Sequence, residues 1–222
     1  MENHVVKIIS VQNITHDVKQ FTIQKPADYD FIPGQATDVS INTPELKNEK
    51  RPFTFTSLKD NKNLQFTIKI YEGHDGVTKE LDKLSHGDEL IIHDVWGAIQ
   101  YQGEGVFIAG GAGVTPFIAI LKNLHAENKL GNNKLIFTNK TEKDIILENE
   151  FQEMLGSNFI NILTDENNSK YETGHIDVSF LKEHISNFHQ KFYICGPPKF
   201  MDAIKNALAE LGASSDSLVF EK

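Results

Sequence analysis

A glycine-rich segment near the middle of the chain has the residue types that bind a phosphate. An apolar run, Gly105–Gly110, leads into Gly111 and Gly113, and Thr115 and Pro116 then open a segment with helical spacing. Glycines permit tight turns and let backbone N–H groups approach a ligand closely. Proline suits the first helical position, and the unpaired N–H groups at a helix start attract anions. The segment predicts a pyrophosphate-binding turn; the alternative is a glycine-rich turn without a ligand.

This segment departs from two common nucleotide-binding patterns. Pro116 stands where the third glycine of the usual dinucleotide pattern would fall, and the next expected strand ends at Asn139 rather than at an acidic residue. No Gly-Lys-Ser/Thr sequence follows, which excludes the phosphate loop of nucleotide triphosphatases.

A second strand-to-helix junction contains the chain's single cysteine, Cys195, followed by Gly196, Pro197 and Pro198. Ligands of open α/β sheets bind outside the carboxyl ends of the strands, so Cys195 would face such a crevice. The alternative is that Cys195 is simply a small buried apolar residue. The two prolines fix the backbone and start the next helix.

A third segment, Arg51-Pro52-Phe53-Thr54, lies in the first half of the chain. On a strand, Arg51 and Phe53 share one face, whereas Pro52 and Thr54 share the other. An arginine beside an aromatic ring and hydroxyl groups can hold a phosphate and a flat ring. Without a ligand, the segment is an edge strand that contains proline.

The first hundred residues must supply the elements that position this arginine segment. Val, Ile and alternating apolar residues predict six strands separated by turn-forming residues. The strands are His4–Thr15, Val18–Gln24, Ala36–Ile41, Arg51–Ser57, Leu64–Tyr71 and Glu89–Val95, with one short helix at Val77–Leu84. Six short strands at this spacing predict a closed antiparallel β-barrel.

The second half alternates strands with helices, which predicts an α/β domain: a parallel sheet with helices on both faces. Expected strands are Gly105–Gly110, Lys134–Thr138, Asn158–Leu163, Lys191–Cys195 and Leu218–Phe220. Expected helices are Thr115–Asn128, Leu147–Leu155, Asp177–His184 and Pro197–Leu211. We therefore expect a barrel domain over residues 1–101 and an α/β domain over residues 102–222.

Composition restricts the possible functions. The formal charge is −9, without a basic stripe, which argues against nucleic-acid binding. One cysteine can form neither an internal disulfide nor, by itself, an iron–sulfur or zinc site, and no metal site is predicted. The sequence shows no membrane span and no signal-peptide pattern, so a cytoplasmic location is expected.

The three segments, in this order and spacing, resemble the ferredoxin–NADP reductase superfamily. Its flavin motif is Arg-x-Tyr-Ser/Thr, its nicotinamide motif is Gly-Gly-x-Gly-x-Thr-Pro, and its late motif is Cys-Gly-Pro-Pro. A fourth segment agrees, because Gly76-Val77-Thr78 opens the helix at the position where the family seats the flavin phosphates. The resemblance covers essentially the whole chain. It implies a flavin-binding barrel domain, an NAD(P)-binding α/β domain and an NAD(P)H-dependent oxidoreductase.

The resemblance also implies roles for individual residues. Arg51 would bind a flavin phosphate, Phe53 would lie against the flavin ring where the family usually has tyrosine, and Thr54 would lie near flavin N5. Hydride transfer would then occur where Thr54 meets Thr115 and Cys195. Residues implied to contact FAD or the dinucleotide are Arg51, Pro52, Phe53, Thr54, Lys69, Ile70, Tyr71, Gly76, Val77, Thr78, Gly110, Gly111, Gly113, Thr115, Pro116, Asp165, Cys195, Gly196, Pro197 and Pro198.

At the C-terminal end, Glu221 fits the acidic position of the family's Glu-x-Tyr ending, and it completes the expected catalytic set of Thr54, Thr115, Cys195 and Glu221. The aromatic residue that covers the flavin in plant-type members has no counterpart after Glu221, so we expect an accessible flavin face.

Cofactor and partner choice follow from the same resemblance. The expected flavin is FAD rather than FMN, because the helix start at Gly76–Thr78 suits a pyrophosphate. Asp165 would repel a 2′-phosphate and favours NADH over NADPH, although Lys140, Lys143 and Lys170 could reverse this preference. The electron acceptor would be a separate flavodoxin, ferredoxin, heme protein or oxygenase component. The alternative functions are a non-catalytic flavin-binding sensor and a regulatory subunit of a larger complex.

Overall fold

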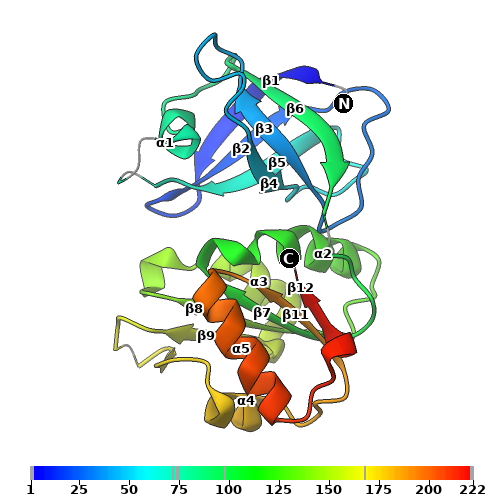
Figure 1. The fold of residues 1–222 in the computed structure, drawn as a ribbon, viewed down its shortest axis with the longest axis vertical. Helices are drawn as coiled ribbons and strands as arrows, with labels where there is room; N and C mark the ends of the chain where they lie inside the picture. Colours follow the sequence, from blue (N-terminus) through cyan, green and yellow to red (C-terminus); the bar gives the residue numbers. More distant parts are fainter. Residues whose placement is uncertain (1–2, 72, 74–75, 98, 168, 221–222) are drawn as a thin grey trace. The chain divides into compact units, whose positions relative to one another are not determined.

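The computed structural model describes residues 3–71, 73, 76–97, 99–167 and 169–220. It divides into two compact units, formed by Met1–Gln100 with Thr115–Asn123 and by Tyr101–Val114 with Leu124–Lys222. The strands form two six-stranded sheets. In Figure 1 one sheet lies in the blue-to-green part of the chain and the other in the green-to-red part. The first sheet is antiparallel and the second is parallel, which confirms the predicted change of architecture.

The first sheet closes on itself as a barrel. Its strands are β1 (His4–Asn13), β2 (Val18–Gln24), β3 (Ala36–Ile41), β4 (Arg51–Thr54), β5 (Asn63–Lys69) and β6 (Glu89–Trp96), in the order β4-β3-β6-β1-β2-β5. The two ends of this order meet, because Phe55 and Phe66 form an antiparallel bridge and Thr56 N donates to Gln65 O over 2.8 Å. The predicted six-stranded barrel is confirmed.

Strand β1 links the two halves of the barrel. Residues His4–Lys7 pair with β6, whereas residues from Ile8 onward pair with β2. The change of partner coincides with a β-bulge between Ile8 and Ser10, and an extra residue of this kind bends a strand and increases its twist. The bulge therefore helps to curve the sheet toward closure.

Alternating apolar residues fill the barrel core, as their period of two predicts. Leu64, Phe66 and Ile68 on β5 are each at most 2% exposed. Helix α1 (Val77–Leu81) adds Val77 and Leu81 to the same core, so the sequence of this short helix is explained by its buried face. The helix ends at Leu81 rather than at the expected Leu84.

In the second sheet, the first strand along the chain lies in the middle of the strand order. Its strands are β7 (Gly105–Gly110), β8 (Lys134–Asn139), β9 (Phe159–Leu163), β10 (Glu172–Thr173), β11 (Lys191–Cys195) and β12 (Leu218–Phe220), in the order β10-β9-β8-β7-β11-β12. From β7 the chain moves outward through β8 and β9, then returns to place β11 on the other side of β7. Strand order therefore reverses between β7 and β11, and such switch points are where open α/β sheets bind ligands.

Helices cover both faces of this sheet, as predicted. The helices that follow α1 are α2 (Thr115–Ala126), α3 (Glu148–Leu155), α4 (Val178–His184) and α5 (Pro198–Glu210). Helices α4 and α5 pack on one face through a cluster that includes Ile136, Leu181 and Leu208. Helix α3 packs on the opposite face, where the rings of Phe151 and Phe159 lie 5.5 Å apart. Short 3₁₀ turns are η1 (Gly111–Val114), η2 (Glu142–Asp144), η3 (Gly156–Asn158) and η4 (Ser215–Ser217).

A hydrogen-bond network closes the amino edge of the sheet, which we define as Tyr101–Gly105 with Asn133. Asn133 is completely buried, and its Oδ1 accepts from Gly105 N over 3.0 Å. Its Nδ2 donates to Leu130 O over 2.7 Å and to Tyr101 OH over 3.1 Å. This side chain thus joins three separate stretches of chain where β7 and β8 begin.

Tyr193 holds the same edge from β11. Its hydroxyl accepts from Gln102 N over 2.8 Å and donates to Gly103 O over 2.7 Å. Its ring stacks on Phe107 with centroids 4.3 Å apart. Burial raises the pKa of Tyr193 to about 12, because the charged phenolate is disfavoured away from water.

Strands β4 and β10 differ most from the sequence expectation, whereas β1, β5, β6, β8 and β9 differ from it by one or two residues at one or both ends. Strand β4 ends at Thr54 rather than Ser57, because only one bridge, at Phe55, continues the pairing toward β5. Strand β10 was not expected, since its two exposed residues, Glu172 and Thr173, carry no apolar pattern. Its pairing with β9 adds an edge to the sheet. No helix among the described residues is long and apolar enough to span a membrane.

Candidate functional site

Strand β4 presents Arg51 to solvent. Its side chain is 48% exposed, its Nη1 donates to Lys50 O over 2.7 Å, and it lies 3.9 Å from the Glu49 carboxylate. An exposed ion pair at this distance is weak, and the guanidinium has five N–H donors. Arg51 can therefore turn donors toward an anionic ligand without leaving a buried partner unpaired.

Phe53 and Thr54 are both half-buried on β4, opposite Thr37 and Ala36 of β3. The Phe53 ring packs against the barrel core, with its centroid 6.3 Å from that of Phe66. Pro52 is exposed. Part of the Phe53 ring is therefore already used in packing, and only the remaining surface can contact a flat ligand.

At the end of β5, the side chains of Lys69 and Ile70 are already paired or buried, and Tyr71 is exposed. The Lys69 ammonium pairs with the Asp17 carboxylate over 2.7 Å, and the Ile70 side chain is 6% exposed in the core. Burial alone would raise the pKa of Asp17, but the hydrogen bond and charge of Lys69 outweigh burial and lower it. Ile70 N donates to Asp17 O over 2.7 Å, whereas Tyr71 is 48% exposed and presents its ring.

Helix α1 begins at a bare glycine. Gly76 has an extended backbone, no side chain caps the helix start, and a Cβ at Gly76 would meet no atom within 4 Å. Val77 points into the core, so this turn can bind a ligand through backbone N–H groups and the half-buried Thr78. The open glycine, these donors and the exposed Arg51 fit a group that carries a pyrophosphate and a flat ring, as FAD does.

In the parallel sheet, the glycine turn and the cysteine loop lie against each other at the switch point. Ala109 pairs with Cys195 across β7 and β11, and a Cβ at Gly113 would overlap the backbone carbonyl of Cys195. Gly111 adopts φ +54°, a conformation that favours glycine, and a Cβ there would meet nothing within 4 Å. The structure thus brings these sequence-predicted residues together, with Gly113 required by close approach and Gly111 by conformation.

Phe200 supports both loops and was not singled out by the sequence. A Cβ on Gly110 would lie 3.1 Å from the Phe200 ring, and a Cβ on Gly196 would lie 2.6 Å from it. Pro197 caps and Pro198 starts helix α5, which carries this ring. The only sequence signal is an aromatic residue two positions after the second proline, which is not specific without the three-dimensional contact.

Asp165 follows β9 at the carboxyl end of the sheet. It is exposed, its Oδ1 accepts from Thr164 Oγ1 over 2.8 Å, and its N–H donates to Lys140 O over 2.9 Å. A surface pocket of about 390 Å³ lies at this end and is lined by Thr141, Glu142, Lys143 and Glu166. Glu166 anchors the pocket, because its carboxylate accepts from Glu142 N over 2.8 Å.

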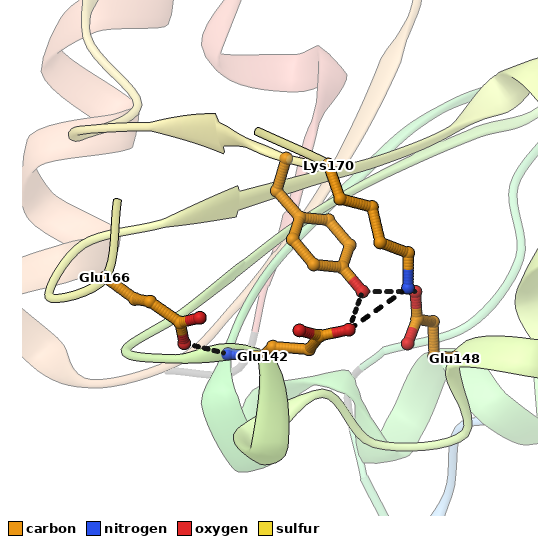
Figure 2. A network of polar contacts seen from close by, with 5 residues as sticks. Glu142, Glu148, Glu166 and Lys170 are labelled. Atoms are coloured by element: carbon orange, nitrogen blue, oxygen red, sulfur yellow. Dashed lines mark hydrogen bonds and ion pairs between the residues drawn. The ribbon is translucent and has the colours of Figure 1, made fainter. Parts of the chain in front are cut away.

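Lys170, one of the cations that could attract a 2′-phosphate, is held by two carboxylates (Figure 2). Its Nζ donates to Glu142 Oε1 over 3.2 Å and to Glu148 Oε1 over 3.0 Å. The single hydroxyl proton of Tyr171 is shared between the same two oxygens, at 3.1 and 2.7 Å. Hydrogen bonds with Tyr171 and Glu148 raise the pKa of Lys170 above its ordinary value. The positive charge of Lys170 is therefore balanced locally, and the pocket lining itself carries two carboxylates, Glu142 and Glu166, against the one cation Lys143.

Three predicted residues need separate mention. Thr115 opens α2 and is half-buried, and Pro116 follows it in the first turn. Glu221 lies outside the described residues, so its expected role is not addressed by the structure.

Two family models match the chain, one on each half. The model described as an oxidoreductase FAD-binding domain matches residues 5–101, and the model described as an oxidoreductase NAD-binding domain matches residues 107–206. The first match covers the barrel strands, and the second covers the glycine turn and the cysteine loop.

Known proteins resemble the chain along most of its length. NADH-cytochrome b5 reductase 2-A of Vanderwaltozyma polyspora is 30% identical over 219 residues, which are 88% of this chain and 72% of that protein. The reductase component of propane 2-monooxygenase from Rhodococcus jostii is 24% identical, over 97% of this chain and 62% of that protein. A ferredoxin NADP⁺ reductase from Neisseria gonorrhoeae, solved with FAD and NADP, shares the fold with a TM-score of 0.87 at 18% identity, over 100% of this chain and 98% of that one.

Proposed function

The chain belongs to the ferredoxin–NADP reductase superfamily, and we propose that it takes hydride from NADH and passes single electrons to a separate acceptor protein. It is an NAD(P)H-dependent flavin oxidoreductase with FAD- and NAD-binding domains. The observation that carries the proposal is the packing of the Gly111–Gly113 turn against Cys195 at the switch point of the parallel sheet.

The proposed dinucleotide site belongs to a functional domain spanning residues 102–222. The backbone N–H groups of Gly111–Val114 and the start of α2 at Thr115 would bind the pyrophosphate, because a helix start attracts anions. Gly110, Pro116, Gly196, Pro197 and Pro198 would shape this site. Cys195 would contact the nicotinamide, at a position fixed by its contact with Gly113.

The proposed flavin site belongs to a functional domain spanning residues 1–101. Arg51 would bind a phosphate, and Gly76, Val77 and Thr78 would donate to the pyrophosphate. Pro52, Phe53, Lys69, Ile70 and Tyr71 would line the flavin. Thr54 would donate a hydrogen bond near N5, and Thr115 and Glu221 would complete the set around the reacting atoms.

Bound FAD supplies the redox chemistry: it accepts a hydride and releases electrons one at a time. The chain's contribution is to position the two ligands, because hydride transfer requires donor and acceptor atoms about 3–3.5 Å apart. The proposed acceptor is a flavodoxin, a ferredoxin, a heme protein or an oxygenase component. The relatives named as a cytochrome b5 reductase and a monooxygenase reductase component support this range.

NADH is the proposed donor because the surroundings of the pocket are acidic. Asp165 is exposed, and the pocket lining contains two carboxylates, Glu142 and Glu166, against one cation, Lys143. Lys170 is already paired with Glu142 and Glu148. A 2′-phosphate would bring further negative charge to these carboxylates, which is unfavourable. The similarity to a protein named as an NADH-cytochrome b5 reductase supports the same choice.

An anaerobic titration tests the proposal. The purified chain is expected to carry FAD, identified after release by chromatography, and stoichiometric NADH is expected to bleach its visible absorbance. Adding cytochrome b5, a flavodoxin or a ferredoxin separately would then identify the acceptor class by reoxidation. A flavin that binds but is not bleached by NADH or NADPH would contradict the proposal and favour a sensor or a regulatory subunit.

A further inference from the structure

Asn139, the last residue of β8, carries a buried and unpaired carboxamide. The residue is 5% exposed, and neither Nδ2 nor Oδ1 has a hydrogen-bond partner within the described part of the chain. A primary amide can donate two hydrogen bonds and accept others, so burying it without partners lowers stability. Buried polar groups of this kind are rare in native proteins and need a reason.

The backbone carbonyl of Asn139 is paired, whereas its side chain is not. Asn139 O accepts from Thr164 N over 2.9 Å and from Thr164 Oγ1 over 3.5 Å. The end of β8 is therefore fixed to the segment that follows β9, and the unpaired amide is not explained by a frayed strand end.

Sheet register places Asn139 next to the glycine turn. Gly110 of β7 pairs with Thr138 of β8, so Asn139 lies level with Gly111, the first residue of η1, and β8 contacts this turn. Alternation along β8 puts Asn139 on the face opposite Ile136, which belongs to the cluster under α4 and α5. The amide thus lies at the carboxyl end of the sheet, on the face away from α4 and α5.

Asn133, immediately before the same strand, shows that this fold can satisfy a buried asparagine. Its Oδ1 and Nδ2 together make hydrogen bonds to Gly105, Leu130 and Tyr101. The two asparagines therefore differ in their hydrogen bonding. The side chain of Asn133, at the amino edge, has all its partners within the protein, whereas that of Asn139, at the proposed ligand-binding edge, has none among the described residues.

We propose that Asn139 is a positioning residue for the dinucleotide. When the pyrophosphate lies on the Gly111–Val114 turn, the turn adjusts and the Asn139 carboxamide gains hydrogen bonds to its backbone, so part of the binding free energy comes from pairing this amide. The amide acts through the turn rather than on the ligand, because its atoms have no exposed surface. This inference rests on the proposed dinucleotide site.

The test compares Asn139→Leu with Asn133→Leu in the full-length, FAD-loaded protein. Leucine has a similar volume and no polar atoms, so Asn139→Leu is expected to leave the melting temperature without NAD⁺ unchanged or raised. Its dissociation constant for NAD⁺, measured by calorimetry, is expected to rise about tenfold. In steady-state kinetics KM for NADH is expected to rise while kcat is retained, since the amide does not touch the reacting atoms.

The matched variant is expected to behave in the opposite way. Asn133→Leu should lower the melting temperature, because it leaves Gly105 N–H unpaired, and should leave NAD⁺ affinity unchanged. Equal NAD⁺ affinity in Asn139→Leu and the unmodified protein would overturn the inference. If Asn139→Leu does not fold, Asn139→Ser is measured against the same criterion. A failure of the unmodified protein to bind NAD⁺ would instead contradict the proposed function.

Discussion

The two edges of the parallel sheet are built from the same strands and have opposite chemistry. At the amino edge, Asn133 and Tyr193 close a network that leaves none of their polar side-chain atoms unpaired among the described residues. At the carboxyl edge, which we define as Gly110–Gly113, Asn139 and Cys195–Gly196, glycines replace side chains and the Asn139 amide is buried without partners. We therefore propose that the amino edge contributes mainly to stability and that the carboxyl edge contributes mainly to ligand binding.

Gly105 and Gly113 allow the two edges to be compared directly, because each packs closely against one end of β11. A Cβ at Gly105 would overlap the carbonyl of Lys191, where β11 begins, and a Cβ at Gly113 would overlap that of Cys195, where β11 ends. The steric demand is the same at both positions, so any difference between their alanine variants reports the function of the edge.

The largest expected effect is that of Gly113→Ala. The added methyl group must separate the glycine turn from Cys195, and a displacement of about 1 Å in a reacting complex can lower kcat/KM about 100-fold. Stopped-flow measurement of flavin reduction by NADH checks this loss.

Gly105→Ala is the matched control for that variant. We expect it to lower the unfolding free energy by about 2 kcal/mol through overpacking, with kcat/KM for NADH retained. A loss of NADH reduction in Gly105→Ala equal to that in Gly113→Ala would break the proposed division between the edges.

Tyr193→Phe is expected to have the next largest effect, on stability alone. The change removes hydrogen bonds to Gln102 N and Gly103 O and keeps the ring stacked on Phe107. We expect a loss of about 1–2 kcal/mol in unfolding free energy. Chemical denaturation followed by circular dichroism measures it, and an NAD⁺ affinity that changed together with stability would count against the comparison.

Asp165→Asn is expected to change dinucleotide preference at the carboxyl edge by a smaller amount. Removing one exposed carboxylate near a 2′-phosphate relieves a repulsion of about 1 kcal/mol. The ratio of kcat/KM for NADPH to that for NADH should therefore rise roughly fivefold. The exposed Glu183 on α4 provides a control, since Glu183→Gln should leave this ratio unchanged. An unchanged ratio in both variants would show that Asp165 does not contribute to the preference for NADH.

The expected effect that is smallest at neutral pH is a pH dependence at the amino edge, because it appears only in strongly alkaline solution. The pKa of Tyr193 is raised to about 12, so between about pH 10 and 12 the unfolded chain loses a proton that the folded chain retains. Stability is complete below about pH 10 and falls as the pH rises through this window. Tyr29, whose pKa burial also raises to about 12, contributes a parallel loss in the barrel.

Denaturation midpoints of the unmodified protein and of Tyr193→Phe across this window separate the two tyrosines. The decline should be shallower in the variant, and identical slopes would show that Tyr193 does not couple to unfolding.

Sequence predicted the fold closely because local patterns and global packing agree. Strands β2, β3, β7, β11 and β12 have the expected boundaries, since alternation or a short apolar run marks each of them. The glycine turn was also recognisable, because Gly111 and Gly113 answer local requirements of conformation and close approach. Strand β10 carries no such pattern and is defined by its parallel pairing with β9.

The parts of the site that escaped prediction depend on contacts between distant residues. Phe200 is one apolar residue among many until its ring is placed against Gly110 and Gly196. Lys170 was considered a possible phosphate ligand, and only the fold shows that Glu142 and Glu148 already hold it. The unpaired amide of Asn139 is likewise a property of its surroundings and not of its residue type.

The order β10-β9-β8-β7-β11-β12 has a consequence for the ribosome-bound chain. The glycine turn follows β7 and is synthesised early, whereas the Cys195 loop follows β11 and emerges near the end. Domains generally fold as units during synthesis, so this sheet cannot be completed until β11 has emerged from the ribosome. A translation product that ends before β11 would contain the Gly111–Val114 turn but lack the Cys195 loop that packs against Gly113. If the proposed dinucleotide site is correct, such fragments would not compete with the finished protein for NADH.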